Sequence, residues 1–182
     1  MKTLLLSGVH GVGKGYLLEQ ININTKTYTI LSASNLIRRY KDATDAGYKK
    51  VSSVKDNQEI LLMALNEEQE KAEGTLIIDG HLCIINANDE VERIPDCFFE
   101  RGQIDGIILL QDEASNISNR LKNRDNQQMT ISFINEMQQK EINFATHLKN
   151  TYGIEYEIIK PQCNQAYFEE IIQRIGGHKY GK

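Results

Sequence analysis

The residues with the clearest chemical signature lie near the start of the chain. An apolar run ends at Gly8, four residues follow, and Gly13 and Lys14 come directly before a helical pattern. This is the spacing of a phosphate-binding loop between a strand and a helix. The glycines let successive N–H groups turn toward an anion, the positive end of the helix points to the same place, and the lysine can reach the outer phosphates of a nucleoside triphosphate. The predicted nucleotide-binding residues of this loop are Gly8, His10, Gly11, Val12, Gly13, Lys14, Gly15 and Tyr16.

A carboxylate is expected beside this loop. Residues 75–79 form a continuous apolar run, typical of a strand buried on both faces, and the run ends at Asp79. Ligands of open parallel sheets bind beyond the carboxyl ends of the strands, so Asp79 should lie where Lys14 points. Magnesium prefers carboxylate oxygen and water. Asp79 is therefore predicted to orient the Mg²⁺ of a bound nucleotide, directly or through water.

The elements that position these residues alternate along the chain. Further apolar strand patterns cover 28–31, 104–110 and 154–159, and amphipathic helical patterns separate them. The alternation predicts an α/β protein with the three-layer P-loop NTPase fold of kinase type, built on a five-stranded parallel sheet with a short lid. At 182 residues, the chain is expected to form one domain, 1–182.

Several local features refine this prediction. Thr130 should cap a long helix whose buried stripe holds Ile134, Met137, Ala145 and Leu148, and Asn164 should cap the last helix. Ser34 or Asn35 should cap the helix that follows the second strand. Residues 82–102, which include Phe98 and Phe99, are expected to be irregular.

Composition narrows the class of partner. The formal charge of −4 argues against a nucleic-acid partner and favours small-molecule nucleotides. No apolar run approaches the roughly 20 residues that cross a bilayer, so no membrane contact is expected. The three cysteines lack paired metal spacing and indicate a reducing, cytoplasmic compartment. The oligomeric state stays open.

Two motifs resemble a known family. The Gly-Lys-Gly ending of the loop resembles adenylate kinases and related nucleoside monophosphate kinases, whose loop reads G-x-P-G-x-G-K-G-T. His10 stands in place of the family's proline, and Tyr16 in place of Thr or Ser. The sequence Asp79-Gly80-His81 is similar to the D-x-H of archaeal adenylate kinases. The resemblance extends loop by loop over essentially the whole chain.

The resemblance implies an acceptor site. Residues 32–38 look like the S-T-G-D-L-L-R stretch of adenylate kinases, which places Ser34 and Arg38 at the acceptor, with Arg38 gripping its phosphate. His81 would belong to the same acceptor site. The monophosphate-binding segment would span about 32–73.

The resemblance also implies a lid over about 120–130. Arg120 and Arg124 match the family's R-L-x-x-R, in which one arginine lies across the ATP base and phosphates while the other stabilises the transferring group. Lys160 and Pro161 would begin the loop over the adenine edge. The implied catalytic residues are Lys14, Asp79, Arg120 and Arg124.

The expected activity is phosphoryl transfer from ATP, with Mg²⁺ as cofactor, to a nucleoside monophosphate. Two arginines of the family are missing, since Cys83 replaces one and residues 141–145 lack the other. Two alternatives therefore remain open. The chain would be a P-loop ATPase or nucleotide-dependent switch that acts with a macromolecular partner, or a kinase of another small-molecule acceptor.

Overall fold

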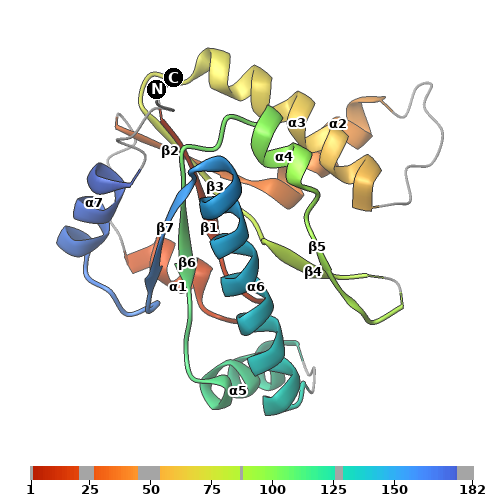
Figure 1. The fold of residues 1–182 in the computed structure, drawn as a ribbon, viewed down its shortest axis with the longest axis vertical. Coiled ribbons are helices and arrows are strands. Elements are labelled where there is room, and N and C mark those ends of the chain that lie inside the picture. Colours follow the sequence, from red (N-terminus) through yellow and green to blue (C-terminus); the bar gives the residue numbers. More distant parts are fainter. Residues whose placement is uncertain (1, 21–26, 45–53, 87, 126–128, 176–182) are drawn as a thin grey trace.

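A computed structural model describes residues 2–20, 27–44, 54–86, 88–125 and 129–175. Five strands form one sheet in the order β2-β3-β1-β6-β7, and every pairing in it is parallel (Figure 1). This confirms the predicted α/β fold with its five-stranded parallel sheet. The strands are β1 (Lys2–Ser7), β2 (Tyr28–Ser32), β3 (Thr75–Asp79), β6 (Gly106–Leu110) and β7 (Glu155–Ile159).

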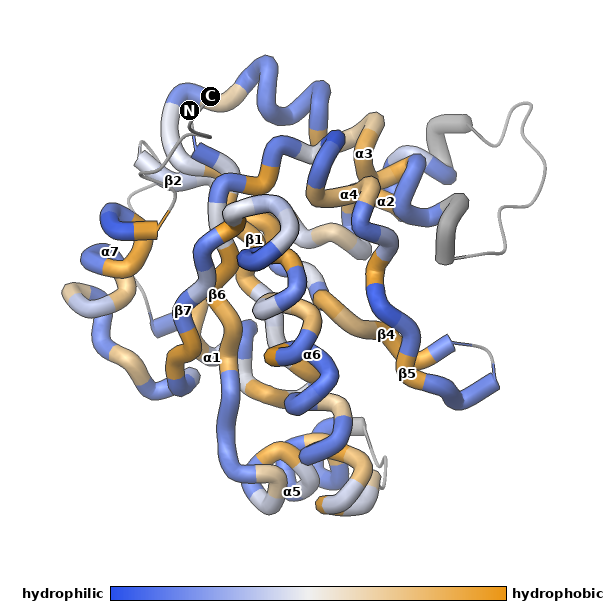
Figure 2. The backbone as a smooth tube through the Cα atoms, in the orientation of Figure 1, coloured by the Kyte–Doolittle hydropathy of each residue, from blue (hydrophilic) through white to orange (hydrophobic). Residues whose placement is uncertain are grey.

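Helices cover both faces of the sheet, because alternate strand residues point to opposite sides. Leu5, Ile78 and Ile107 belong to a core with residues of α2, α3, α4 and the second half of α6. Leu4 and Ile108 belong to a second core with residues of α1, α5 and α7. Figure 2 shows the hydrophobic residues along the central strands and polar residues on the outer helices. The helices are α1 (Lys14–Gln20), α2 (Ala33–Thr44), α3 (Val54–Lys71), α4 (Asp96–Arg101), α5 (Ala114–Asp125), α6 (Ile131–Tyr152) and α7 (Gln165–Arg174).

Two of the three predicted helix caps are confirmed. The Thr130 side chain accepts a hydrogen bond from the Phe133 amide at the start of α6, and the Asn164 side chain accepts one from the Tyr167 amide at the start of α7. The prediction for α2 is wrong. That helix begins at Ala33, and it is the Ser32 hydroxyl that accepts a hydrogen bond from the Asn35 amide, at 3.4 Å.

The expectation of irregular structure over 82–102 is also wrong. Strands β4 (Cys83–Ile85) and β5 (Val91–Arg93) form an antiparallel hairpin, and α4 follows it. Phe98 and Phe99 are buried in the first core, with their rings edge to face at 5.3 Å. Strands of three residues and a helix of six are too short to produce a clear hydrophobic period, so the sequence did not reveal them.

The predicted lid, about 120–130, is only partly described. Residues 120–125 are the end of α5, residues 126–128 lie outside the described residues, and α6 begins at Ile131. Among the described helices, none combines the length and the apolar content needed to cross a membrane.

Candidate nucleotide and acceptor site

The loop between β1 and α1 has the backbone of a phosphate-binding loop. Gly8, Gly11 and Gly13 have φ angles of 147°, 79° and 113°, which side chains rarely adopt. Space is restricted as well. A Cβ on Gly8 would lie 2.8 Å from the carbonyl oxygen of Leu110, and one on Gly13 would lie 2.9 Å from the ring of Pro161. The glycines are therefore required by conformation and by packing.

This loop borders the cavity of the candidate site, which has a volume of about 890 Å³. The loop and α5 line it, and so do α2, α3, α4 and the β4–β5 hairpin. In Figure 1, α5 lies at the bottom of the molecule and α2, α3 and α4 lie toward the top, so the lining has a loop end and an opposite end at these three helices. The sequence-predicted residues that line it are His10, Gly11, Val12, Gly13, Lys14, Gly15, Tyr16, Ser34, Asp79, His81, Arg120 and Arg124. The topology thus brings most of the predicted site together at the carboxyl ends of β1, β2 and β3.

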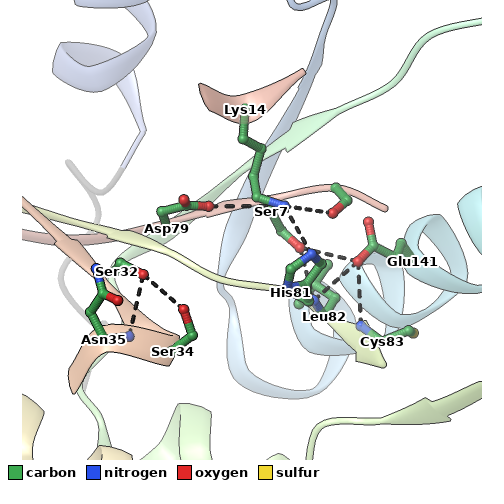
Figure 3. Close-up of polar contacts among 11 residues, drawn as sticks. Ser7, Lys14, Ser32, Ser34, Asn35, Asp79, His81, Leu82, Cys83 and Glu141 are labelled. Carbon is green, nitrogen blue, oxygen red and sulfur yellow. Dashed lines mark hydrogen bonds and ion pairs between the residues drawn. The ribbon is translucent and has the colours of Figure 1, made fainter. Parts of the chain in front are cut away.

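Lys14 lies at the centre of this group (Figure 3). Its ammonium donates to the carbonyl oxygen of Gly8 at 2.9 Å, lies 3.0 Å from Nε2 of His81 and is 3.9 Å from the Asp79 carboxylate. Only 9% of Lys14 is exposed. Burial lowers the pKa of Lys14, while the charges of Asp79 and Glu141 oppose this shift. The pKa of Lys14 is thus lowered overall, although the two carboxylates favour the charged ammonium.

Asp79 ends β3 and has the position expected of a magnesium-orienting carboxylate. It lines the cavity, and its side chain is 28% exposed beside Lys14. Burial raises its pKa, and the charge of Lys14 opposes that change. No cluster of three or more His, Cys, Asp or Glu side chains gathers as metal ligands within the described ranges. The oxygen donor of Asp79 fits a Mg²⁺ ion that takes its other ligands from phosphates and water.

His81 is held neutral beside Lys14. Burial lowers its pKa to about 3, and the nearby Lys14 and His10 shift it in the same direction. The ring therefore accepts a hydrogen bond from the Lys14 ammonium at Nε2. At neutral pH, His81 contributes a polar contact without a charge.

Glu141 lies next to the site without lining the cavity, and the sequence did not identify it. It reaches from α6 to the carboxyl end of β1, where Oε1 accepts hydrogen bonds from the Ser7 hydroxyl and from the amides of Leu82 and Cys83 (Figure 3). Glu141 is 1% exposed. Burial raises its pKa to about 7, against the charge of Lys14 and the three hydrogen bonds. A usable signal existed, because position 141 lies within the apolar stripe of α6, four residues from Met137 and from Ala145.

The two arginines of α5 contact the loop itself. Arg120 donates to the backbone carbonyls of Gly11 and Val12 and forms an ion pair with Asp112. Burial alone would raise the pKa of Asp112, but hydrogen bonds from Arg120, Asn116 and the amide of Glu113 lower it overall. Arg124 lies 2.9 Å from Nε2 of His10. Asp112, which supports Arg120 without lining the cavity, is the second such residue that the sequence did not identify.

Other predicted residues lie outside the cavity lining. Arg38 is exposed and donates to the side-chain oxygen of Asn35 at 3.2 Å. Lys160 is exposed, whereas Pro161 is buried against Gly13. Gly8 shapes the loop without being part of the lining. The roles predicted for Arg38 and Lys160 stay predictions.

The fold and the loop define a P-loop kinase-like domain, a class of nucleotide-binding α/β proteins. A family model described as an AAA domain matches residues 7–138, from the end of β1 into α6. The chain therefore belongs to this AAA domain family. The search of curated proteins found no match.

One solved structure supports the fold, and a second is a weaker match. The tunicamycin resistance protein of Deinococcus radiodurans is similar, with a TM-score of 0.60 and 14% identity over 95% of this chain and 94% of that one. A gluconokinase from Sinorhizobium meliloti 1021 matches with a TM-score of 0.48 and 14% identity, covering 91% of this chain and 86% of its own. At this identity, the tunicamycin resistance protein supports the fold alone.

Proposed function

We propose that this chain transfers a phosphoryl group from ATP to a nucleoside monophosphate. One observation carries the proposal. The phosphate-binding lysine Lys14, the strand-end carboxylate Asp79 and the α5 arginines Arg120 and Arg124 line a single cavity, and this cavity continues to the helices α2 and α3. A donor and an acceptor nucleotide would therefore meet within one cavity.

Phosphoryl transfer depends mainly on positioning and on neutralising charge. In this proposal, the loop amides and Lys14 hold the β- and γ-phosphates, while Arg120 and Arg124 stabilise the charge of the moving group. Asp79 and phosphate oxygens would hold Mg²⁺, which supplies further charge neutralisation. The bond between the γ-phosphorus and its bridging oxygen breaks, a bond forms to a phosphate oxygen of the acceptor, and ADP leaves.

The position of Arg38 favours a second candidate. Because this arginine bonds to Asn35 outside the cavity lining, the acceptor end lacks the phosphate contact that the family resemblance implies for it. An acceptor that offers a hydroxyl group, such as a nucleoside or another small metabolite, would need no such contact. A chain of this kind would be a P-loop kinase with a different substrate.

A coupled assay of ADP formation separates these candidates. ATP–Mg²⁺ would be combined in turn with AMP, CMP, UMP, GMP, their deoxy forms and the corresponding nucleosides. We expect a monophosphate to stimulate ADP formation, and Lys14→Ala to reduce the stimulated rate by about 10²–10³-fold, as for removal of one positioned donor. Lys71→Ala, at an exposed position of α3, is the matched control and should retain the parent rate.

Two outcomes would contradict the proposal. Stimulation by nucleosides alone would identify the second candidate. Phosphate release that no acceptor changes would instead identify an ATPase or a nucleotide-dependent switch.

A further inference from the structure

The end of the cavity near α2, α3 and α4, called the acceptor end here, is lined mainly by apolar side chains. Ile37 of α2, Leu61 of α3, Ile84 of β4 and Phe98 of α4 line it, and all four belong to the first core or pack against it. A ligand at this end would therefore contact aliphatic and aromatic surface. Such walls suit the faces of a flat ring better than they suit a polyol, whose many hydroxyl groups all need hydrogen-bond partners.

Two side-chain amides interrupt this apolar wall. Asn57 and Gln58 of α3 both line the cavity, and Gln58 is only 8% exposed. Asn57 lies one helical turn before Leu61, so both residues share a face of α3. The wall thus combines apolar contact with amide groups.

Asn57 carries an unused hydrogen-bond acceptor. Its side-chain oxygen is buried and has no hydrogen-bond partner within the described part of the chain. A buried acceptor without a partner costs folding free energy, and native structures rarely keep one without a reason. The terminal torsion of asparagine is broad, so the amide can turn this oxygen toward a ligand that offers an N–H group.

From these observations, we infer that Asn57 reads the base of the acceptor and selects a base with an exocyclic amino group. Side-chain amides match the edges of nucleobases and pair with adenine through its amino group. In this arrangement, Ile37, Leu61, Ile84 and Phe98 contact the faces of the base, while the Asn57 oxygen accepts from the amino group at its edge. Adenine, cytosine and guanine all carry such a group, and we assign adenine, because its amino group is the one with which side-chain amides pair. The inference rests on the proposed function, because it assumes that the acceptor is a nucleotide.

The test compares two acceptors that differ only in this amino group, AMP and purine riboside 5′-monophosphate. Binding of each would be measured by calorimetry, with the loop end of the cavity filled by Mg²⁺ and a non-hydrolysable ATP analogue. The proteins would be the parent, Asn57→Leu and Asn66→Leu. Asn66 is an exposed residue of α3 that does not line the cavity, so Asn66→Leu makes the same change at a neutral position.

We expect the parent and Asn66→Leu to bind AMP about tenfold more tightly than the analogue, the value of one good hydrogen bond. Asn57→Leu should bind both acceptors alike. Asn57→Ala should do the same, and it provides the test if the leucine variant fails to fold. The inference is overturned if the parent shows no preference for AMP, if it binds neither acceptor, or if the Asn57 variants keep the preference.

The phosphoryl-transfer assay separates this result from the proposed function. A parent that binds AMP with an Asn57-dependent preference but transfers no phosphoryl group would contradict the function and support the inference. A parent that phosphorylates monophosphates with and without an amino group equally well would contradict the inference alone.

Discussion

At the scale of single residues, the buried side chain of Glu141 depends on its hydrogen bonds to the rest of the protein. A carboxylate that is 1% exposed has lost its water, and only hydrogen bonds inside the protein replace it. Three donors do so here, the Ser7 hydroxyl and the amides of Leu82 and Cys83. If the carboxylate were removed, the Ser7 hydroxyl and the Cys83 amide would lose this acceptor, and the Leu82 amide would keep only the Ser7 hydroxyl oxygen, at 2.8 Å. The effect of a substitution should therefore depend on whether the new side chain can accept a hydrogen bond.

We expect Glu141→Leu to lower the free energy of unfolding by about 2–4 kcal/mol, because it leaves buried donors unpaired. Glu141→Gln keeps an acceptor oxygen and should cost distinctly less. Urea unfolding at pH 7.5 measures both values. Glu136→Leu, at an exposed position of the same helix, should stay within about 0.5 kcal/mol of the parent. Equal losses for the two Glu141 variants would show that the hydrogen bonds are not what this residue supplies.

The sequence was sufficient to predict those site residues whose positions are determined by local spacing. Lys14 and Asp79 could be predicted because a loop motif and the end of a strand determine where they lie. Glu141 could not be assigned a partner, since Ser7 and Leu82 are distant in sequence and meet it only through packing of α6 on the sheet. For Asp112, nothing local to the sequence indicates that Arg120 will turn toward it.

At the scale of elements, the loop between β1 and α1 requires glycine at some positions, while other glycines there could be replaced. Gly8 has a positive φ and lies against the carbonyl oxygen of Leu110, whereas a Cβ on Gly15 would meet nothing within 4 Å. The same substitution at these two positions should thus give opposite results.

Gly8→Ala should lower the free energy of unfolding by about 1–3 kcal/mol, because it combines backbone strain with a steric contact. Gly15→Ala lies in the first turn of α1 and should be neutral or stabilising by about 0.4–1 kcal/mol. Thermal unfolding of both variants measures the difference. Similar melting temperatures for the two would contradict this account of the loop.

Helix α5 and the residues just before it also support the loop. Asp112 holds the guanidinium of Arg120, which in turn donates to the carbonyls of Gly11 and Val12. We expect Asp112→Asn to reduce kcat/KM for ATP by about 10–100-fold, the range seen when a supporting partner is lost. Steady-state kinetics would compare it with Glu113→Gln, a change at the neighbouring exposed residue. An unchanged kcat/KM would show that Arg120 keeps its position without Asp112.

Most long elements could be predicted from sequence, and the short ones could not. Strands such as β3 and β6 appear as continuous apolar runs, and α6 has a clear stripe and a threonine cap. The β4–β5 hairpin has three residues in each strand, and its partly buried residues do not alternate clearly. The cap of α2 was misplaced because Ser32, Ser34 and Asn35 are all good capping residues.

At the scale of the whole molecule, two buried groups, His81 and Glu141, make the stability of the fold depend on pH in opposite ways. The pKa of His81 falls from 6.5 to about 3 on folding, so the unfolded chain binds more protons between these values and stability rises with pH. The pKa of Glu141 rises from 4.5 to about 7, so the folded chain binds more protons and stability falls as pH increases through that range. Between about pH 4.5 and 6.5, the two effects oppose each other.

We therefore expect the parent to gain stability from pH 3 to about 4.5 and to change little from there to 6.5. Glu141→Gln removes the opposing group, so its stability should continue to rise up to about pH 6.5. Urea midpoints measured from pH 3.5 to 7.5 on both proteins test this prediction. Parallel curves for the two would contradict the assignment of the shift to Glu141.

The Glu141 network also constrains how this sequence can change over generations. One carboxylate oxygen from α6 joins the end of β1 to the start of the β4–β5 hairpin, so a replacement can preserve these contacts only if it keeps an acceptor oxygen, as glutamine does. Descendants that lose this acceptor oxygen should show a compensating change at position 7 or near position 82. In a set of diverged sequences, these three places in the chain should vary together.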